Sequence, residues 1–147
     1  MEADSAPKRH DASRPDVARR NVLLVEDDPE TQSELAKALS DSGARVVGTG
    51  SGEAALALME QWPAGMVVVS DAIGGIGGLE VARRIHESSP DVPIVLMSEA
   101  GDEKESEAKA VAARLAGVFA TLTRPFDRRV LAELVVAMAV AADVVMS

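Results

Sequence analysis

Acidic side chains directly follow the first apolar run of this 147-residue chain. The run at 22–25 leads into Glu26, Asp27 and Asp28, three consecutive carboxylates that repel one another unless solvent or a cation compensates. Asp28 followed by Pro29 suits the start of a helix, which leaves Glu26 and Asp27 unexplained. An oxygen-seeking cation such as Mg²⁺ is the usual compensation, and a solvated acidic corner is the alternative.

Later apolar runs also end in residues that could take part in chemistry. These residues are Ser70 and Asp71, Ser98 and Glu99, and Thr123 and Arg124. Each has a plain explanation when taken singly, such as a hydroxyl that satisfies backbone groups or an arginine on the surface. If the run ends meet, they instead form an acidic pocket with a hydroxyl on one side and a fixed cation on the other.

The elements that would position these residues alternate along the chain. Short apolar runs rich in β-branched residues, typical of strands covered on both faces, lie at 22–25, 44–48, 66–69, 93–97 and 117–122. Segments with helical periodicity lie between and after them, at Pro29–Ser40, Gly52–Gln61, Leu79–Glu87, Asp102–Ala116 and Asp127–Met146. This order predicts a single α/β domain over 21–147, a doubly wound five-stranded parallel sheet with helices on both faces.

The carboxyl ends of the strands are where such sheets bind ligands, so the polar residues described above are expected to converge there. Residues 1–20 contain many charges and almost no large apolar side chain, which predicts a flexible tail, with a basic docking arm as the alternative.

Composition excludes several classes of function. The net charge of −9 combines +1 in residues 1–20 with −10 in the rest of the chain, and so acidic a body argues against nucleic acid as a partner. The absence of cysteine excludes disulfides, thiolate metal sites and cysteine nucleophiles. No apolar run approaches the ~20 residues of a membrane span, and the N-terminus has no signal-peptide core. We therefore expect a cytoplasmic protein with no membrane partner.

Five motifs in order resemble the receiver (CheY-like) domain of two-component response regulators over residues 21–143: VLLVEDDP, SGEAAL, GGLE, PIVLMS and LTRPFD. The resemblance implies a flavodoxin-like (βα)5 fold in which an aspartate of the third strand accepts a phosphoryl group from a histidine kinase. It also implies Mg²⁺ held by Glu26 and Asp27. Ser98 and the cation at position 124 would then sense the phosphorylated product.

The sequence departs from the family pattern at the acceptor. An ungapped alignment places Ser70 at the acceptor position and Asp71 one residue late. Neighbouring strand residues point in different directions, so only a one-residue slip in the glycine-rich segment 73–78 would aim Asp71 at the pocket. A serine at that position would not form the usual acyl phosphate.

Arg124 stands where the family has lysine. Its planar guanidinium prefers bidentate contacts and could lock onto Glu26, Asp27 or Asp71.

The last helical segment carries a valine stripe, defined as Val136, Val140 and Val144, on the side opposite its predicted core face. We interpret the stripe as a partner or homodimer surface, and a helix continuing beneath a missing domain is the alternative.

These features predict a receiver-like signalling module, not an enzyme, that binds a partner protein and has impaired or absent aspartyl phosphorylation. The alternative is a conventional phosphoacceptor, phosphorylated on Asp71 by a histidine kinase with Mg²⁺ on Glu26 and Asp27.

Overall fold

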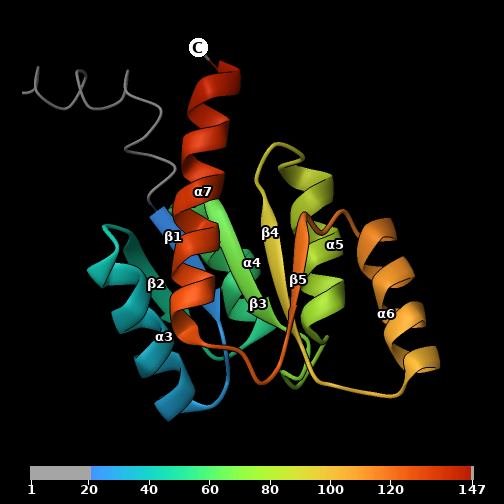
Figure 1. Cartoon of the computed structure of the whole chain (residues 1–147). Coiled ribbons are helices and arrows are strands. Elements are labelled where there is room, and N and C mark those ends of the chain that lie inside the picture. The colour runs from blue at the N-terminus through green and yellow to red at the C-terminus, as the bar shows by residue number, and fades with distance from the viewer. Residues whose placement is uncertain (1–20, 147) are drawn as a thin grey trace, which may run out of the picture.

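The computed structural model describes the backbone of residues 21–146 and the side chains of residues 21–140, so the predicted tail at 1–20 lies outside the described residues. Within this range, strands and helices alternate along the whole chain (Figure 1). The strands are β1 (Asn21–Val25), β2 (Arg45–Thr49), β3 (Met66–Ser70), β4 (Ile94–Ser98) and β5 (Ala120–Thr123). The helices are α3 (Pro29–Asp41), α4 (Gly52–Gln61), α5 (Gly78–Ser88), α6 (Glu103–Leu115) and α7 (Arg128–Met146).

The strands form one parallel sheet in the order β2-β1-β3-β4-β5, which confirms the predicted α/β architecture. The order reverses at β1, because β2 pairs with one side of it and β3 with the other. Val25 lies level with Thr49 and Val69, and Ser70 lies level with Met97. The carboxyl ends of the strands therefore meet at one edge of the sheet, as expected.

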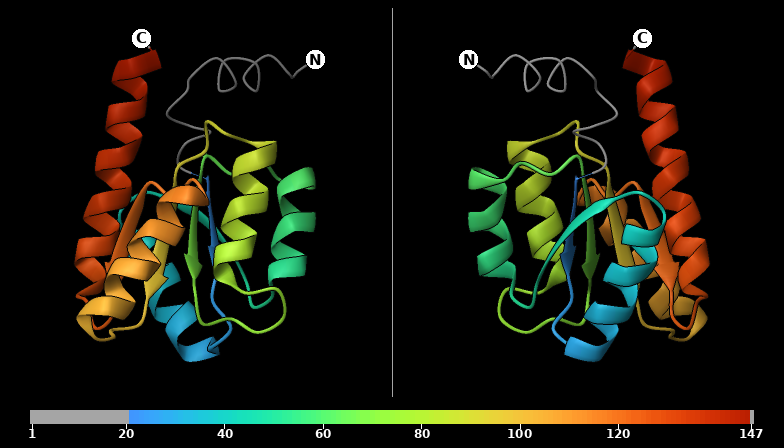
Figure 2. Two further views of the ribbon diagram at one scale, coloured as in Figure 1. Left: turned by 90° about the vertical axis from the view of Figure 1, so that its right-hand side faces the viewer. Right: turned by 90° about the vertical axis from the view of Figure 1, so that its left-hand side faces the viewer.

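Helices cover both faces of the sheet, as Figure 2 shows from two sides. Helices α4, α5 and α6 contribute buried side chains to the core on one face, and α3 and α7 contribute to the core on the other. The side chains of β1, β3 and β4 are buried on both faces, apart from the half-buried Asn21 at the start of β1. The prediction of burial on both faces is wrong for β2 and β5, because these are the edge strands and keep partly exposed side chains.

Local capping explains where the helices begin. Asp28 caps α3 by accepting a hydrogen bond from the Thr31 N–H, and Pro29 occupies the first turn. The hydrogen bond from the Thr31 hydroxyl, with the one from its N–H, holds the pKa of Asp28 below its usual value. The fifth strand begins at Ala120 rather than at 117, because Gly117 has a φ of 84° that ends the turn after α6.

The glycine-rich segment after β3 sets the position of the neighbouring strand end. Gly75 and Gly77 have φ values of 73° and 81°, a backbone conformation that residues other than glycine rarely adopt. Gly78 opens α5 so close to the end of β3 that a methyl group there would overlap the Ser70 carbonyl oxygen. The segment therefore presses the start of α5 against the residues that could act as acceptor.

Candidate functional site

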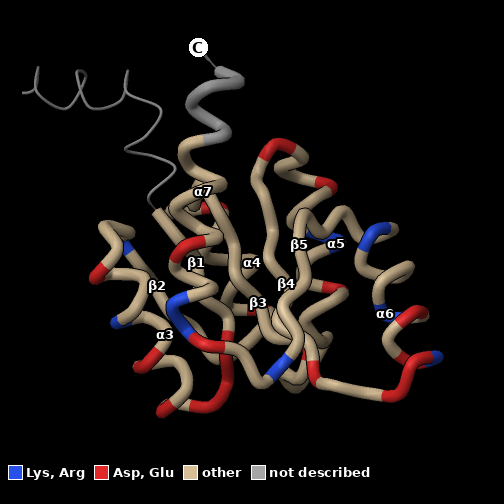
Figure 3. Tube along the Cα trace, in the orientation of Figure 1, with Lys and Arg blue, Asp and Glu red and all other residues tan. Residues whose placement is uncertain are grey.

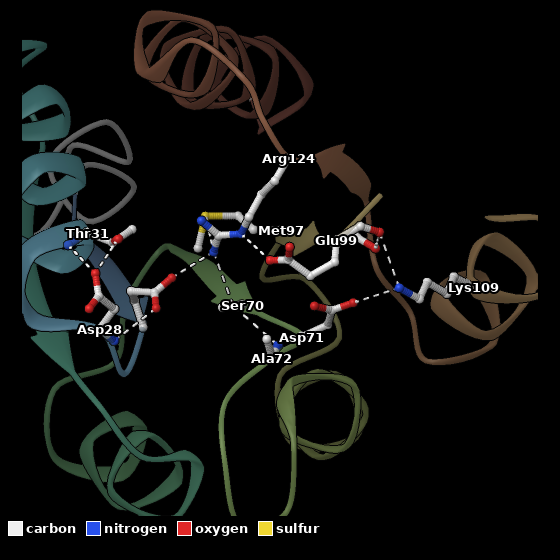
Figure 4. A network of polar contacts seen from close by, with 11 residues as sticks. Asp28, Thr31, Ser70, Asp71, Ala72, Met97, Glu99, Lys109 and Arg124 are labelled. Atoms are coloured by element: carbon white, nitrogen blue, oxygen red, sulfur yellow. Dashed lines mark hydrogen bonds and ion pairs between the residues drawn. The ribbon is translucent and has the colours of Figure 1, made fainter. Parts of the chain in front are cut away.

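Arg124 lies at the centre of the polar residues gathered at the sheet edge (Figure 4). Its Nη2 atom donates to Glu26 Oε1 at 2.7 Å and to the Ser70 hydroxyl at 3.2 Å, and lies 4.0 Å from Met97 sulfur. Its Nε atom lies 3.0 Å from Glu99 Oε2, an ion pair without hydrogen-bond alignment. The prediction that this arginine could lock onto Glu26 agrees with these contacts.

Glu26 has no free carboxylate oxygen in this arrangement. Oε1 accepts from Arg124, and Oε2 accepts from the Asp28 N–H at 3.0 Å. The Glu26 side chain is 5% exposed and that of Arg124 is 23% exposed. A buried carboxylate with a guanidinium against it already has the compensating charge that the sequence suggested a metal ion would supply.

Asp71 has a different partner. Its Oδ2 atom lies 3.7 Å from Lys109 Nζ of α6, whereas its Oδ1 atom is buried and has no hydrogen-bond partner among the described residues. The Asp71 side chain is 18% exposed, and the ladder of β3 and β4 continues through it because its N–H donates to the Met97 carbonyl at 2.9 Å. None of the Arg124 contacts described above involves Asp71.

Alternation along the strands explains this division. Side chains two positions apart in a strand lie on the same face of the sheet. Leu24 precedes Glu26 by two positions, and Val68 precedes Ser70 by two. Both Leu24 and Val68 lie in the core beneath α3 and α7. The side chain preceding Asp71 by two positions, Val69, lies in the core beneath α4, α5 and α6. Ser70 therefore turns to Arg124 and Asp71 to α6, as Figure 4 shows.

The other predicted site residues lie at the same edge without joining these contacts. Ser98 is 3% exposed, and its hydroxyl donates to the carbonyl of the next residue, Glu99, at 3.4 Å. Asp27 is exposed and forms no ion pair among residues 21–140. Figure 3 shows the acidic positions that follow β1 and begin α3 and α6, around this end of the sheet.

The arrangement does not fit a bound Mg²⁺ ion. Within the described part of the chain, no three Asp, Glu or His side chains lie close enough together to hold a metal ion. Both oxygens of Glu26 are occupied by donors, so this residue offers nothing to a cation while Arg124 stays in place.

Lys109 is a site residue that the sequence analysis missed. It lies four residues before the buried Ala113 and seven before the buried Ala116, the spacing that puts three residues on one face of a helix. That periodicity was the available signal for a lysine turned toward the sheet.

The valine stripe lies partly within the described side chains. Val136 and Val140 are 43% and 58% exposed, whereas the side chain of Val144 lies outside the described residues.

Between residues 21 and 146, no helix combines the length and the apolar character needed to cross a membrane.

The model of the response regulator receiver domain family matches residues 22–136. This chain belongs to that family. Its receiver domain is 33% identical over 110 residues to the C4-dicarboxylate transport transcriptional regulatory protein DctD of Pseudomonas aeruginosa, which covers 74% of this chain and 23% of DctD. It is 30% identical over 115 residues to the transcriptional regulatory protein TcrA of Mycobacterium tuberculosis, which covers 76% of this chain and 42% of TcrA. The chain thus spans less than half the length of these two relatives.

Solved structures show the same fold. The crystal structure of a CheY-like response regulator receiver domain protein from Methanospirillum hungatei superposes with a TM-score of 0.76 at 18% identity, covering 86% of this chain and 98% of that one. The BeF3-activated DrrB receiver domain superposes with a TM-score of 0.71 at 21% identity, covering 82% and 97%. The fold of the chain thus agrees with the family match, and receiver domains of this family are signalling modules of two-component systems.

Proposed function

We propose that this receiver domain signals by binding a partner protein and that its aspartyl phosphorylation is impaired, because Arg124 holds Glu26 and because Ser70, rather than Asp71, lies beside this pair. The observation that carries the proposal is the 2.7 Å contact between Arg124 Nη2 and Glu26 Oε1. The guanidinium neutralises the carboxylate that the family uses for a metal ion. A cation must displace it before Glu26 becomes available. We further propose that the domain acts in the cytoplasm downstream of a histidine kinase and is not itself an enzyme.

Asp71 is the proposed acceptor, although its side chain turns away from Glu26 and Arg124. The Ser70 side chain is buried, and its hydroxyl accepts hydrogen bonds from Arg124 and from the Ala72 N–H at 3.3 Å. The Asp71 carboxylate is 18% exposed, and its Oδ2 atom lies 3.7 Å from Lys109, beyond hydrogen-bond distance. A carboxylate is the nucleophile that forms an acyl phosphate.

Acetyl phosphate tests both parts of the proposal. The intact chain is incubated with acetyl phosphate with and without Mg²⁺, and the hydroxylamine-labile adduct is followed by intact mass. We expect slow formation in the parent with little acceleration by Mg²⁺, none in Asp71→Asn and an unchanged rate in Ser70→Ala. Adduct formation in the parent that Mg²⁺ strongly accelerates contradicts the proposed impairment.

The partner surface is proposed to be the valine stripe. Support comes from the exposure of Val136 and Val140 on the helix face turned away from the core residues Leu131 and Val135. Val140→Glu is expected to abolish self-association, measured by light scattering, or partner capture, without changing the midpoint of urea unfolding. Phe119→Glu, where the side chain is 64% exposed just before β5, is the matched control on another surface. Loss of association in the control alone would contradict the assignment of the interface to the valine stripe.

A further inference from the structure

Lys109 reaches the sheet edge from α6 and touches both Asp71 and the loop after β4. Its ammonium nitrogen lies 3.2 Å from the Glu99 carbonyl oxygen, to which it donates, and 3.7 Å from Asp71 Oδ2. The latter is an ion pair beyond hydrogen-bond length. An ammonium group has three N–H donors, and only the one on Glu99 is used in the contacts described here.

Arg124 is poorly placed to respond to a change at Asp71. Its guanidinium is held by Glu26 and Glu99, and strand alternation places it on the face of the sheet opposite to the Asp71 side chain. A move toward Asp71 would leave Glu26, 5% exposed, buried without its counter-charge. Of these two cations, Lys109 is therefore the one that can follow a change at Asp71 without such a penalty.

We propose that Lys109, rather than Arg124, binds the phosphoryl group on Asp71 and couples it to α6. This inference rests on the phosphorylation of Asp71 proposed above. In the reaction with acetyl phosphate, a carboxylate oxygen of Asp71 forms a bond to phosphorus while the bond from phosphorus to the acetate oxygen breaks, and acetate leaves with the electron pair. The product carries additional negative charge and phosphoryl oxygens that accept hydrogen bonds. A free N–H donor of Lys109 then makes a charge-assisted hydrogen bond in place of the 3.7 Å ion pair.

The helix that carries Lys109 is shallowly packed. Of the residues of α6, all of which the structure describes, only Ala113 is buried. An element with so little buried apolar surface moves at low free-energy cost. Val111 and Leu115 on the same helix are 47% and 82% exposed, so a shift of α6 changes an apolar part of the molecular surface. A change at Asp71 would thereby alter a surface of α6 to which a partner can bind.

The test compares the intact chain with Lys109→Gln, Lys109→Arg and a matched control, Lys104→Gln. Lys104 is exposed in the first turn of α6 and lies outside the contacts described above. Each protein is treated with acetyl phosphate and Mg²⁺, and the backbone amide resonances of residues 103–115 are recorded before and after adduct formation. The rate of adduct formation is measured by intact mass.

The parent, the control and Lys109→Arg are expected to show adduct-dependent shifts in α6. Lys109→Gln is expected to lose these shifts and to form the adduct about tenfold more slowly, the loss typical of one charge-assisted hydrogen bond. If Lys109→Gln forms no adduct and Lys109→Arg forms it as the parent does, the result supports binding of the phosphoryl group by the cation at position 109. An adduct in Lys109→Gln with the α6 shifts of the parent overturns this inference alone. Absence of any adduct at Asp71 in the parent overturns both the inference and the acceptor assignment beneath it.

Discussion

The ion pair between Glu26 and Arg124 is expected to contribute measurably to the stability of the fold. At the observed 2.7 Å, two unit charges attract by about 6 kcal/mol at an effective dielectric constant of about 20. Desolvation of Glu26 offsets much of this attraction, and the 23% exposure of Arg124 allows solvent to screen the rest. We therefore expect a net coupling of about 2 kcal/mol, well above the value for exposed pairs.

A double-mutant cycle measures this coupling. The variants are Glu26→Gln, Arg124→Met and their combination, and the free energy of unfolding is obtained from urea titrations at neutral pH. Glutamine keeps an acceptor for the Asp28 N–H, so the cycle isolates the charge interaction. The matched control is the pair Lys37–Asp41, which has a similar N···O distance of 2.9 Å but side chains 77% and 65% exposed, and whose coupling is expected to stay below about 0.5 kcal/mol.

The Arg124→Met variant also tests the reason for the proposed impairment. If Arg124 occupies the position of a metal ion, Mg²⁺ stabilises Arg124→Met against urea more than it stabilises the parent, since binding to the native state alone raises the free energy of unfolding. A coupling no larger than that of Lys37–Asp41, or equal stabilisation of parent and variant by Mg²⁺, would refute the reasoning.

Two further predictions concern the neighbouring helix α5. Hydrogen bonds from Arg83, and then from Arg84, lower the pKa of Glu80 from about 4.5 to about 2, so the stability they add is full above pH 4.5 and is lost as the pH falls toward 2. The carboxyl-carbon NMR shift of Glu80 should titrate near pH 2, and a midpoint near 4.5 would disprove the pairing. Gly78→Ala forces a methyl group against the Ser70 carbonyl and should lower the free energy of unfolding by about 1–3 kcal/mol in urea. Unchanged stability would show that α5 can move away from β3.

The sequence was sufficient for the fold because its signals are local and repeated. Apolar runs of strand length alternate with segments of helical period, and Asp28 with Pro29 marks the first helix start. Burial was overestimated for β2 and β5, because the composition of a run does not reveal whether its strand lies at the edge of the sheet. That information comes from strand order, which depends on contacts between distant segments.

The site was predictable only as a set of strand ends. Which of the side chains at these strand ends make contact depends on the face of the sheet on which each one lies. A shift of one residue in the strand register moves a side chain to the opposite face. Ser70 and Asp71 illustrate this, because they are neighbours in the chain yet bind cations from different elements, Arg124 after β5 and Lys109 in α6. An alignment of motifs distinguishes these two candidate acceptors only by their positions in the sequence. The structure adds a chemical difference, since the serine is bound within a fixed ion-pair cluster, whereas the aspartate meets a single lysine on a weakly packed helix. A change of charge at Asp71 therefore acts on the element that can move most easily, and a change at Ser70 would act on the one that is held most firmly.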